Sequence, residues 1–173
     1  MKISLKKVSN SGFTLVETLV YLFIFILISS GAIGLLFSLN DLFVQYKLKQ
    51  ALLASGTTAM ERILLEIREA DSVTIADSVF ASSTAGVLVL DKGTDTIKID
   101  TEAGSLGIYK NNILEGVLHS DEIEVTGSTY YYYEQDGMVL IRVRLDLSST
   151  VGVQTEDWSL TGGTIIRSSY ETN

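Results

Sequence analysis

The first residue whose type and position suggest chemistry is Glu17. It is the only charged residue between Phe13 and Leu39, in a stretch that is otherwise almost wholly apolar. An acidic side chain in a membrane-spanning helix costs a few kcal/mol even on the milder insertion scales, and such residues usually have a partner. Glu17 is therefore the leading candidate functional residue, and ion pairing is the chemistry that it could perform.

The rest of the chain predicts little catalytic chemistry. There is no cysteine, which excludes disulfides, thiol nucleophiles and Cys-based zinc sites. The single histidine, His119, has no ligand cluster around it and is expected to be an ordinary surface or boundary residue. The sequence contains no hydrolase, zinc-protease, P-loop or dinucleotide-binding motif. We expect no enzymatic activity and no cofactor.

Three aspartates, Asp91, Asp95 and Asp100, raise the question of a calcium site. They do not have the spacing of an EF-hand loop. Aspartate is also a common turn-forming residue, because its side chain bonds to nearby backbone groups. We therefore expect turns here and no metal site.

The elements that must position Glu17 start with the apolar segment. Thr18–Leu39 alone would rise about 33 Å as a helix, enough to cross the hydrocarbon core of a bilayer. Lys2, Lys6 and Lys7 precede it, which predicts a cytoplasmic N-terminus by the positive-inside rule. The alternative is a conventional cleaved signal peptide, but its apolar core is shorter and is followed by a small-residue cleavage site.

The segment from Leu42 to Ala70 continues with a second, amphipathic helical pattern. Met60, Ile63 and Ile67 fall on one face, and charged residues occupy the others. No loop signal separates the two patterns. We expect one helix from Phe13 to about Ala70, with its first half in lipid and an apolar stripe on its second half that needs covering.

The remainder predicts antiparallel β-structure. The clearest strand is Met138–Leu147, in which apolar side chains alternate with Arg142, Arg144 and Asp146. The other expected strands are Val87–Leu90, Thr96–Asp100, Ile108-Tyr109, Ile113-Leu114, Thr129–Tyr133 and one near Gly163–Arg167. The fold class is α+β, with a long N-terminal helix packed against a C-terminal antiparallel sheet.

The residues around Glu17 carry a resemblance to a known family. After a lysine-bearing leader, Ser11-Gly12-Phe13-Thr14-Leu15-Val16-Glu17 resembles the cleavage and methylation motif of type IV prepilins and type II secretion pseudopilins. The resemblance implies that a membrane prepilin peptidase cuts after Gly12 and methylates the new N-terminal Phe13. It also implies that assembly of the filament depends on Glu17, and that the chain meets other pilin or pseudopilin subunits and an inner-membrane assembly platform.

The expected role of Glu17 follows from that cleavage. Phe13 would carry a free amine one helical turn before Glu17, and Glu17 of one subunit could neutralise the amine of its neighbour in a packed filament. The alternative is a glutamate that reaches the membrane interface. That alternative leaves the Gly12-Phe13 context unexplained.

Three weaker features remain. Ser30, Gly34 and Ser38 form a small-xxx-small stripe, which indicates close packing of membrane helices or only the general tolerance of such helices for small residues. The Tyr130–Tyr133 run could be an adhesive surface, but in a two-faced strand alternate tyrosines are expected to be half buried. The C-terminal part more loosely resembles minor pilins and J-type pseudopilins, on the strands at Tyr130–Tyr133, Val139–Leu147 and Thr164–Arg167.

The sequence thus predicts a basic leader (1–12), a hydrophobic half-helix (13–40) and a soluble α+β head (41–173), the head comprising an amphipathic helix over 41–70 and a sheet over about 72–168. We expect a minor pilin or pseudopilin, held in the inner-membrane lipid by one helix with its head extracytoplasmic and later built into a filament. The alternative is a membrane-anchored extracytoplasmic binding protein. The net charge of −8, or −11 without the three leader lysines, argues against non-specific nucleic-acid binding.

Overall fold

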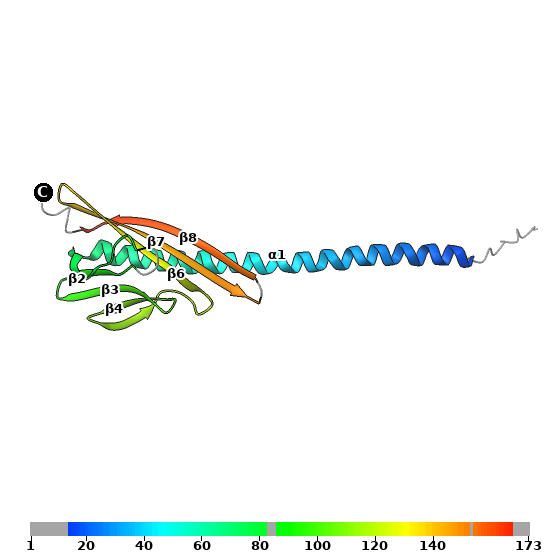
Figure 1. Ribbon diagram of the computed structural model, residues 1–173, viewed down its shortest axis with the longest axis horizontal. Coiled ribbons are helices and arrows are strands. Elements are labelled where there is room, and N and C mark those ends of the chain that lie inside the picture. Colours follow the sequence, from blue (N-terminus) through cyan, green and yellow to red (C-terminus); the bar gives the residue numbers. More distant parts are fainter. Residues whose placement is uncertain (1–13, 83–85, 153, 168–173) are drawn as a thin grey trace, which may run out of the picture. The chain divides into compact units, whose positions relative to one another are not determined.

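A computed structural model describes residues 14–82, 86–152 and 154–167 (Figure 1). A long helix comes first, and antiparallel strands follow it. In chain order the elements are α1 (Leu15–Glu69), β1 (Ser72–Val73), the short 3-10 helix η1 (Ile75–Asp77), β2 (Leu88–Lys92), β3 (Asp95–Glu102), β4 (Ser105–Lys110), β5 (Ile113–Val117), β6 (Glu124–Gln135), β7 (Met138–Val151) and β8 (Gln154–Ile165).

The long helix was predicted over Phe13 to about Ala70 and is observed over Leu15–Glu69. It ends where the chain turns into β-structure, because the Asp71 backbone N–H donates to the Asp91 carbonyl instead of to the helix. The chain divides into two compact units within α1, between Phe43 and Val44. The second unit, called the head below, contains the end of α1 and every strand named above.

The described residues of the head form two antiparallel sheets, where the sequence predicted one. The first has the strand order β1-β2-β3-β4-β5, and the second has the order β6-β7-β8. The sheets stay separate because other backbone groups occupy the free edge of β6. Ala81 and Gly86 donate to the carbonyls of Tyr130 and Ser128, and Val125 donates to the Gly104 carbonyl. A hydroxyl hydrogen bond of 2.9 Å, from Thr101 to Ser128, also links the two sheets.

Neighbouring predicted strands pair as antiparallel hairpins, and two of these hairpins owe their geometry to tight turns. β6 and β7 are joined by Asp136-Gly137, with φ of 51° and 79°, and β4 and β5 by Asn111-Asn112, with φ of 52° and 67°. Two positive φ values in a two-residue loop match the turn that suits the twist of a β-hairpin, and Gly, Asn and Asp tolerate this conformation best.

The alternating strand is confirmed and extends to Val151. Ile141, Val143, Leu145 and Leu147 are buried, while Arg142 and Arg144 are exposed. The last strand was predicted too late in the chain and too short, because it begins at Gln154 and ends at Ile165, two residues before Arg167. Its alternation is weak because it is an edge strand, and side chains such as Trp158, 40% exposed, lie at the surface.

The core of the head lies between α1 and the sheets. The α1 side chains Leu52, Ile63 and Ile67 are fully buried in one cluster with side chains of both sheets, including Leu90, Ile99, Leu106, Ile141 and Leu145. Figure 1 shows β8 running alongside the second half of α1, in agreement with the close approach of Gly162 to Met60. The amphipathic stripe predicted for the second half of the helix is thus covered.

Candidate functional site

The candidate site begins at the first turn of α1, where Thr14 caps the helix. The Glu17 backbone N–H donates to Oγ1 of Thr14 at 3.3 Å, and the Thr18 N–H donates to the Thr14 carbonyl at 3.1 Å. A threonine that bonds to the third helical N–H is a standard N-cap. The cap fixes Glu17 in the first turn, where the helix dipole favours a negative charge.

Glu17 also has a side-chain partner that the sequence interpretation missed. The Tyr21 hydroxyl donates to Oε1 of Glu17 at 3.2 Å, and both side chains are exposed. The signal was available, because residues four apart in a helix lie on the same face. A buried carboxylate would need such a partner, since an unpaired charge in an apolar environment is costly.

The helix around Glu17 presents apolar side chains on all sides. α1 is long and apolar enough to cross a membrane. Its most apolar stretch is not buried by other described residues. The exposed side chains include Leu15, Val16, Leu19, Leu22, Phe23, Phe25, Ile28, Leu36, Phe37 and Phe43. Exposing such a surface to water is unfavourable, and a lipid bilayer or another protein could cover it.

Of the other residues predicted to function in this region, some lie outside the described residues and the rest are exposed on α1. Gly12 and Phe13, the predicted cleavage and methylation residues, lie outside the described residues. Ser30, Gly34 and Ser38 are exposed, and apart from the adjoining residues and the local helix backbone, no described atom lies within 4 Å of the point where a Cβ would sit on Gly34. The stripe therefore has room for a second helix, and its packing role stays a prediction.

The three aspartates considered for calcium each have local partners. The Asp91 carboxylate accepts hydrogen bonds from Ser72 and Thr74. Asp95 accepts from Lys110 and Asn111, and Asp100 accepts from Lys98. The hydrogen bond from Lys110 is the main cause that lowers the pKa of Asp95, and the bond to Asp100 is the main cause that raises the pKa of Lys98. Within residues 14–82, 86–152 and 154–167 no three His, Cys, Asp or Glu side chains gather as a metal site.

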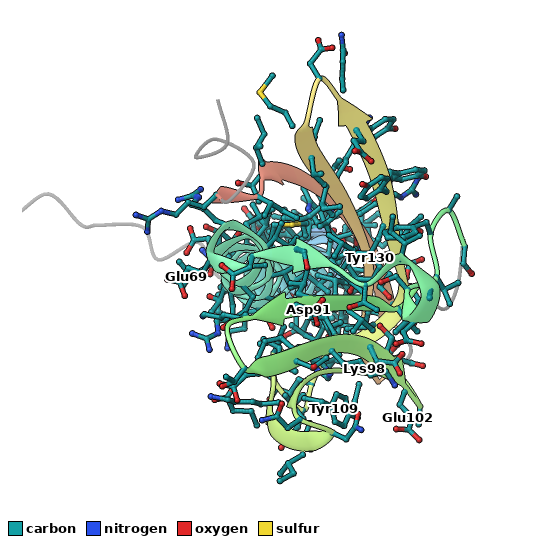
Figure 2. The ribbon with its side chains drawn as sticks, turned by 90° about the vertical axis from the view of Figure 1, so that its left-hand side faces the viewer. Glu69, Asp91, Lys98, Glu102, Tyr109 and Tyr130 are labelled. Carbon is teal, nitrogen blue, oxygen red and sulfur yellow. The ribbon has the colours of Figure 1, made fainter. Side chains whose placement is uncertain are left out.

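Lys98 and Glu102 of β3 lie close to the ring of Tyr109 in β4, on the surface of the first sheet. Figure 2 shows Lys98, Glu102 and Tyr109 near one another and away from Glu69. Lys98 Nζ lies 5.6 Å from the centre of the Tyr109 ring, and the Tyr109 hydroxyl lies 3.5 Å from Glu102. These contacts join the neighbouring strands β3 and β4.

The tyrosine run has two faces, as predicted, but only one face is buried. Tyr130 is fully buried, Tyr131 and Tyr132 are half buried, and Tyr133 is 50% exposed. Tyr132 donates to Glu134 at 2.7 Å. Tyr131 and Tyr133 share the outer face with two arginines of β7, a grouping that the sequence interpretation missed.

His119 is half buried at the boundary of the head, as the sequence predicted, and its Nδ1 lies 2.9 Å from the Ser120 carbonyl.

Comparison of the chain with protein-family models, with curated proteins and with solved structures finds no match.

Proposed function

We propose that this protein is a structural subunit, a minor pilin or pseudopilin, of a type IV pilin-like filament. In this proposal prepilin peptidase cuts the precursor after Gly12, and the mature chain is held in the inner membrane by the first part of α1. Its head lies outside the cytoplasm. Other subunits later replace lipid as the cover of the apolar helix.

The observation that carries the proposal is the position of Glu17. It is an exposed carboxylate in the first turn of a helix whose surrounding side chains are apolar and uncovered. A carboxylate is costly there unless a cation approaches it. The Phe13 amine of a neighbouring mature subunit would be such a cation, and cleavage after Gly12 would create it.

Two further features support the proposal. The cap at Thr14 starts the helix two residues after the proposed cleavage point, so little of the mature chain would precede α1. The head presents an independent α+β unit beyond residue 44, as an anchored filament subunit needs. The resemblance of Ser11–Glu17 to the prepilin motif accounts for the first of these features.

Mass spectrometry of the mature protein tests the proposal directly. We expect a chain that begins at Phe13 and carries one methyl group on its amine. Gly12→Leu should leave an unprocessed membrane precursor, whereas Ser9→Leu, a matched change away from the junction, should still be cut. A mature protein that keeps Met1, or that is cut near Ser29-Ser30, would instead favour an anchored binding protein or a conventional secretion signal.

A further inference from the structure

The outer face of the β6–β8 sheet carries a compact group of aromatic and basic side chains, called the Tyr–Arg patch here. Tyr131, Tyr133, Arg142 and Arg144 border a hollow of about 270 Å³, together with Thr161. The strand register brings them together, because Tyr131 lies opposite Arg142, and Arg144 lies opposite Thr161.

The patch has unused binding capacity. Arg142 is exposed and makes no ion pair with any described residue, whereas Arg144 is paired with Asp146 at 3.0 Å. Tyr133 is 50% exposed, and Leu140 beside it is 38% exposed. Tyrosine and arginine are the residue types that most often anchor protein interfaces, because they combine a large contact area with directed hydrogen bonds.

A complementary acidic surface lies toward the other end of β7 and is called the acidic hollow here. It is an open hollow of about 510 Å³ bordered by Asp121, Glu122 and Glu124. All three side chains are exposed, and within the described part of the chain none of them forms an ion pair. The hollow thus carries three unneutralised carboxylates.

One chain cannot join its own two surfaces. Glu124 lies opposite Ser148, and Ser148 is six residues along β7 from Arg142. At roughly 3.3 Å per residue the two positions are about 20 Å apart, which is beyond the combined reach of an arginine and a glutamate. The two surfaces can therefore neutralise each other only between copies.

We propose that the Tyr–Arg patch of one head binds the acidic hollow of a second copy of this chain. The proposal rests on the proposed filament function and adds a contact between heads to it. Because the two surfaces are different, the contact leaves one free surface at each end, so it can extend into an open series. Nucleic acid is a weaker partner for the patch, because two guanidinium groups on a chain of net charge −8 neutralise few phosphates.

Cysteine cross-linking tests the contact, since the chain has no cysteine of its own. The full-length chain would carry Thr161→Cys at the patch and Thr150→Cys at the hollow, both exposed positions. Thr161 lies opposite Arg144, six residues from Thr150, so a disulfide within one chain is excluded by distance. Oxidation in membranes should give a ladder of dimers, trimers and larger products.

The single-cysteine chains are the controls for geometry. Each should give little dimer, because the contact joins two different surfaces. Efficient dimers from Thr161→Cys alone would show a patch-to-patch contact and would overturn the proposal. A ladder that is no stronger than the products of the two single variants would overturn it as well.

Charge reversal tests the chemistry in the double-cysteine chain. Arg142→Glu and Glu122→Arg should each reduce the ladder about fivefold, the effect of losing one exposed charged contact, and their combination should restore at least half of it. Arg68→Glu makes the same change in charge at an exposed α1 residue outside both surfaces and should leave the ladder unchanged. Unchanged ladders in Arg142→Glu, or no recovery in the combination, would contradict the pairing.

Two readouts separate this contact from the proposed function. Mass spectrometry of the N-terminus and recovery of the chain in sheared filaments report on the filament function, and the ladder reports on the head contact. Normal processing and incorporation without a ladder would overturn only the head contact. Retention of the chain by a short single-stranded DNA, abolished by Arg142→Glu while the ladder persists, would assign the patch to nucleic acid instead.

Discussion

The hydroxyl of Tyr21 donates a hydrogen bond of 3.2 Å to Oε1 of Glu17, one helical turn earlier in α1. This bond occupies one carboxylate oxygen and leaves the other able to accept from a cation. It also holds the side chain against the helix, which reduces the entropy that Glu17 would lose on pairing. In the proposed filament, Tyr21 would thus orient the carboxylate of Glu17.

Substitution of these two residues should separate processing from assembly. Glu17→Ala should insert and be cleaved after Gly12, because Glu17 lies on the mature side of the cut, but its entry into the filament should fail or drop sharply. A buried amine without its counter-charge costs about 3–5 kcal/mol. Glu17→Gln should assemble to an intermediate extent. Filament shearing, run beside a check of processing, measures both.

Tyr21→Phe should have a smaller effect, since it removes the hydroxyl that bonds to Glu17 but keeps the aromatic ring and the carboxylate. Incorporation should fall about fivefold, in line with about 1 kcal/mol for a hydrogen bond. Tyr46→Phe, on the same helix but away from Glu17, is the matched control. Normal incorporation of processed Glu17→Ala would contradict the pairing and leave the cleavage proposal untouched.

The head should fold without the apolar half of α1. The structure divides between Phe43 and Val44, and the buried core lies wholly beyond that point. A chain that starts at Val44 should therefore be soluble, with mixed helix and strand by circular dichroism and one cooperative transition in urea. An insoluble or unfolded product would show that the head needs the first half of the helix.

Most of this fold could be predicted from the sequence because its signals are local. The alternation in β7 and the Asp136-Gly137 turn each lie within one segment, and so does the change of pattern near Asp41. The separation into two sheets could not be predicted, because it depends on backbone bonds from Ala81 and Gly86 to a strand far along the chain. The same holds for the Tyr–Arg patch, which depends on strand register.

For the candidate site, different features could and could not be predicted from the sequence. Glu17 was identified by its chemistry, and its bond with Tyr21 could have been predicted from the spacing of four residues. Outside that site, in the core of the head, the packing of Gly56 could not have been predicted. The sequence shows only a glycine that weakens a helix, whereas the structure shows the side chains of Leu147 and Leu160 pressed against it.

The stability of the head should depend on pH through Lys92. Its Nζ lies 2.5 Å from Glu69 and 3.4 Å from the buried Glu66, which Arg62 also contacts at 2.7 Å. The hydrogen bond from Lys92 is the main cause that lowers the pKa of Glu69, and the same bond raises the pKa of Lys92. The stabilisation of the head by Glu69 is therefore present above pH about 4.5 and is lost as the pH falls through the lowered pKa of Glu69. The stabilisation by Lys92 is lost as the pH rises above about 10.5 and through the raised pKa of Lys92.

Lys92→Met removes the partner of Glu69 and should make the loss of stability at acid pH smaller. Urea unfolding at pH 7 and pH 3.5 measures this, and the difference between the two midpoints should shrink relative to the unaltered head. Arg68→Met, an exposed change on α1 that leaves the Glu69–Lys92 contact in place, should keep the original difference. An equal difference in all three proteins would show that Glu69 and Lys92 do not stabilise the head.

Two effects oppose each other when Gly56 is replaced by a larger residue. Replacing a helical glycine by alanine favours the helix by about 1 kcal/mol. A Cβ on Gly56, however, would lie 2.6 Å from a methyl group of Leu147 and 2.6 Å from one of Leu160. Leu160 is only half buried and can move, but Leu147 is 1% exposed and can move only if the core repacks. Overpacking of this kind costs about 1–3 kcal/mol, so it should outweigh the gain in helix propensity.

Gly56→Ala should therefore lower the free energy of unfolding of the head by up to about 2 kcal/mol, and the larger Gly56→Val should lower it further. Gly116→Ala is the control, because nothing lies within 4 Å of a Cβ there, and the loss of a flexible glycine in β5 should leave the head unchanged or slightly more stable. Urea unfolding of the three variants measures the balance. If Gly56→Ala stabilises the head as much as Gly116→Ala does, then the helix and the sheet are not in the close contact that the structure describes.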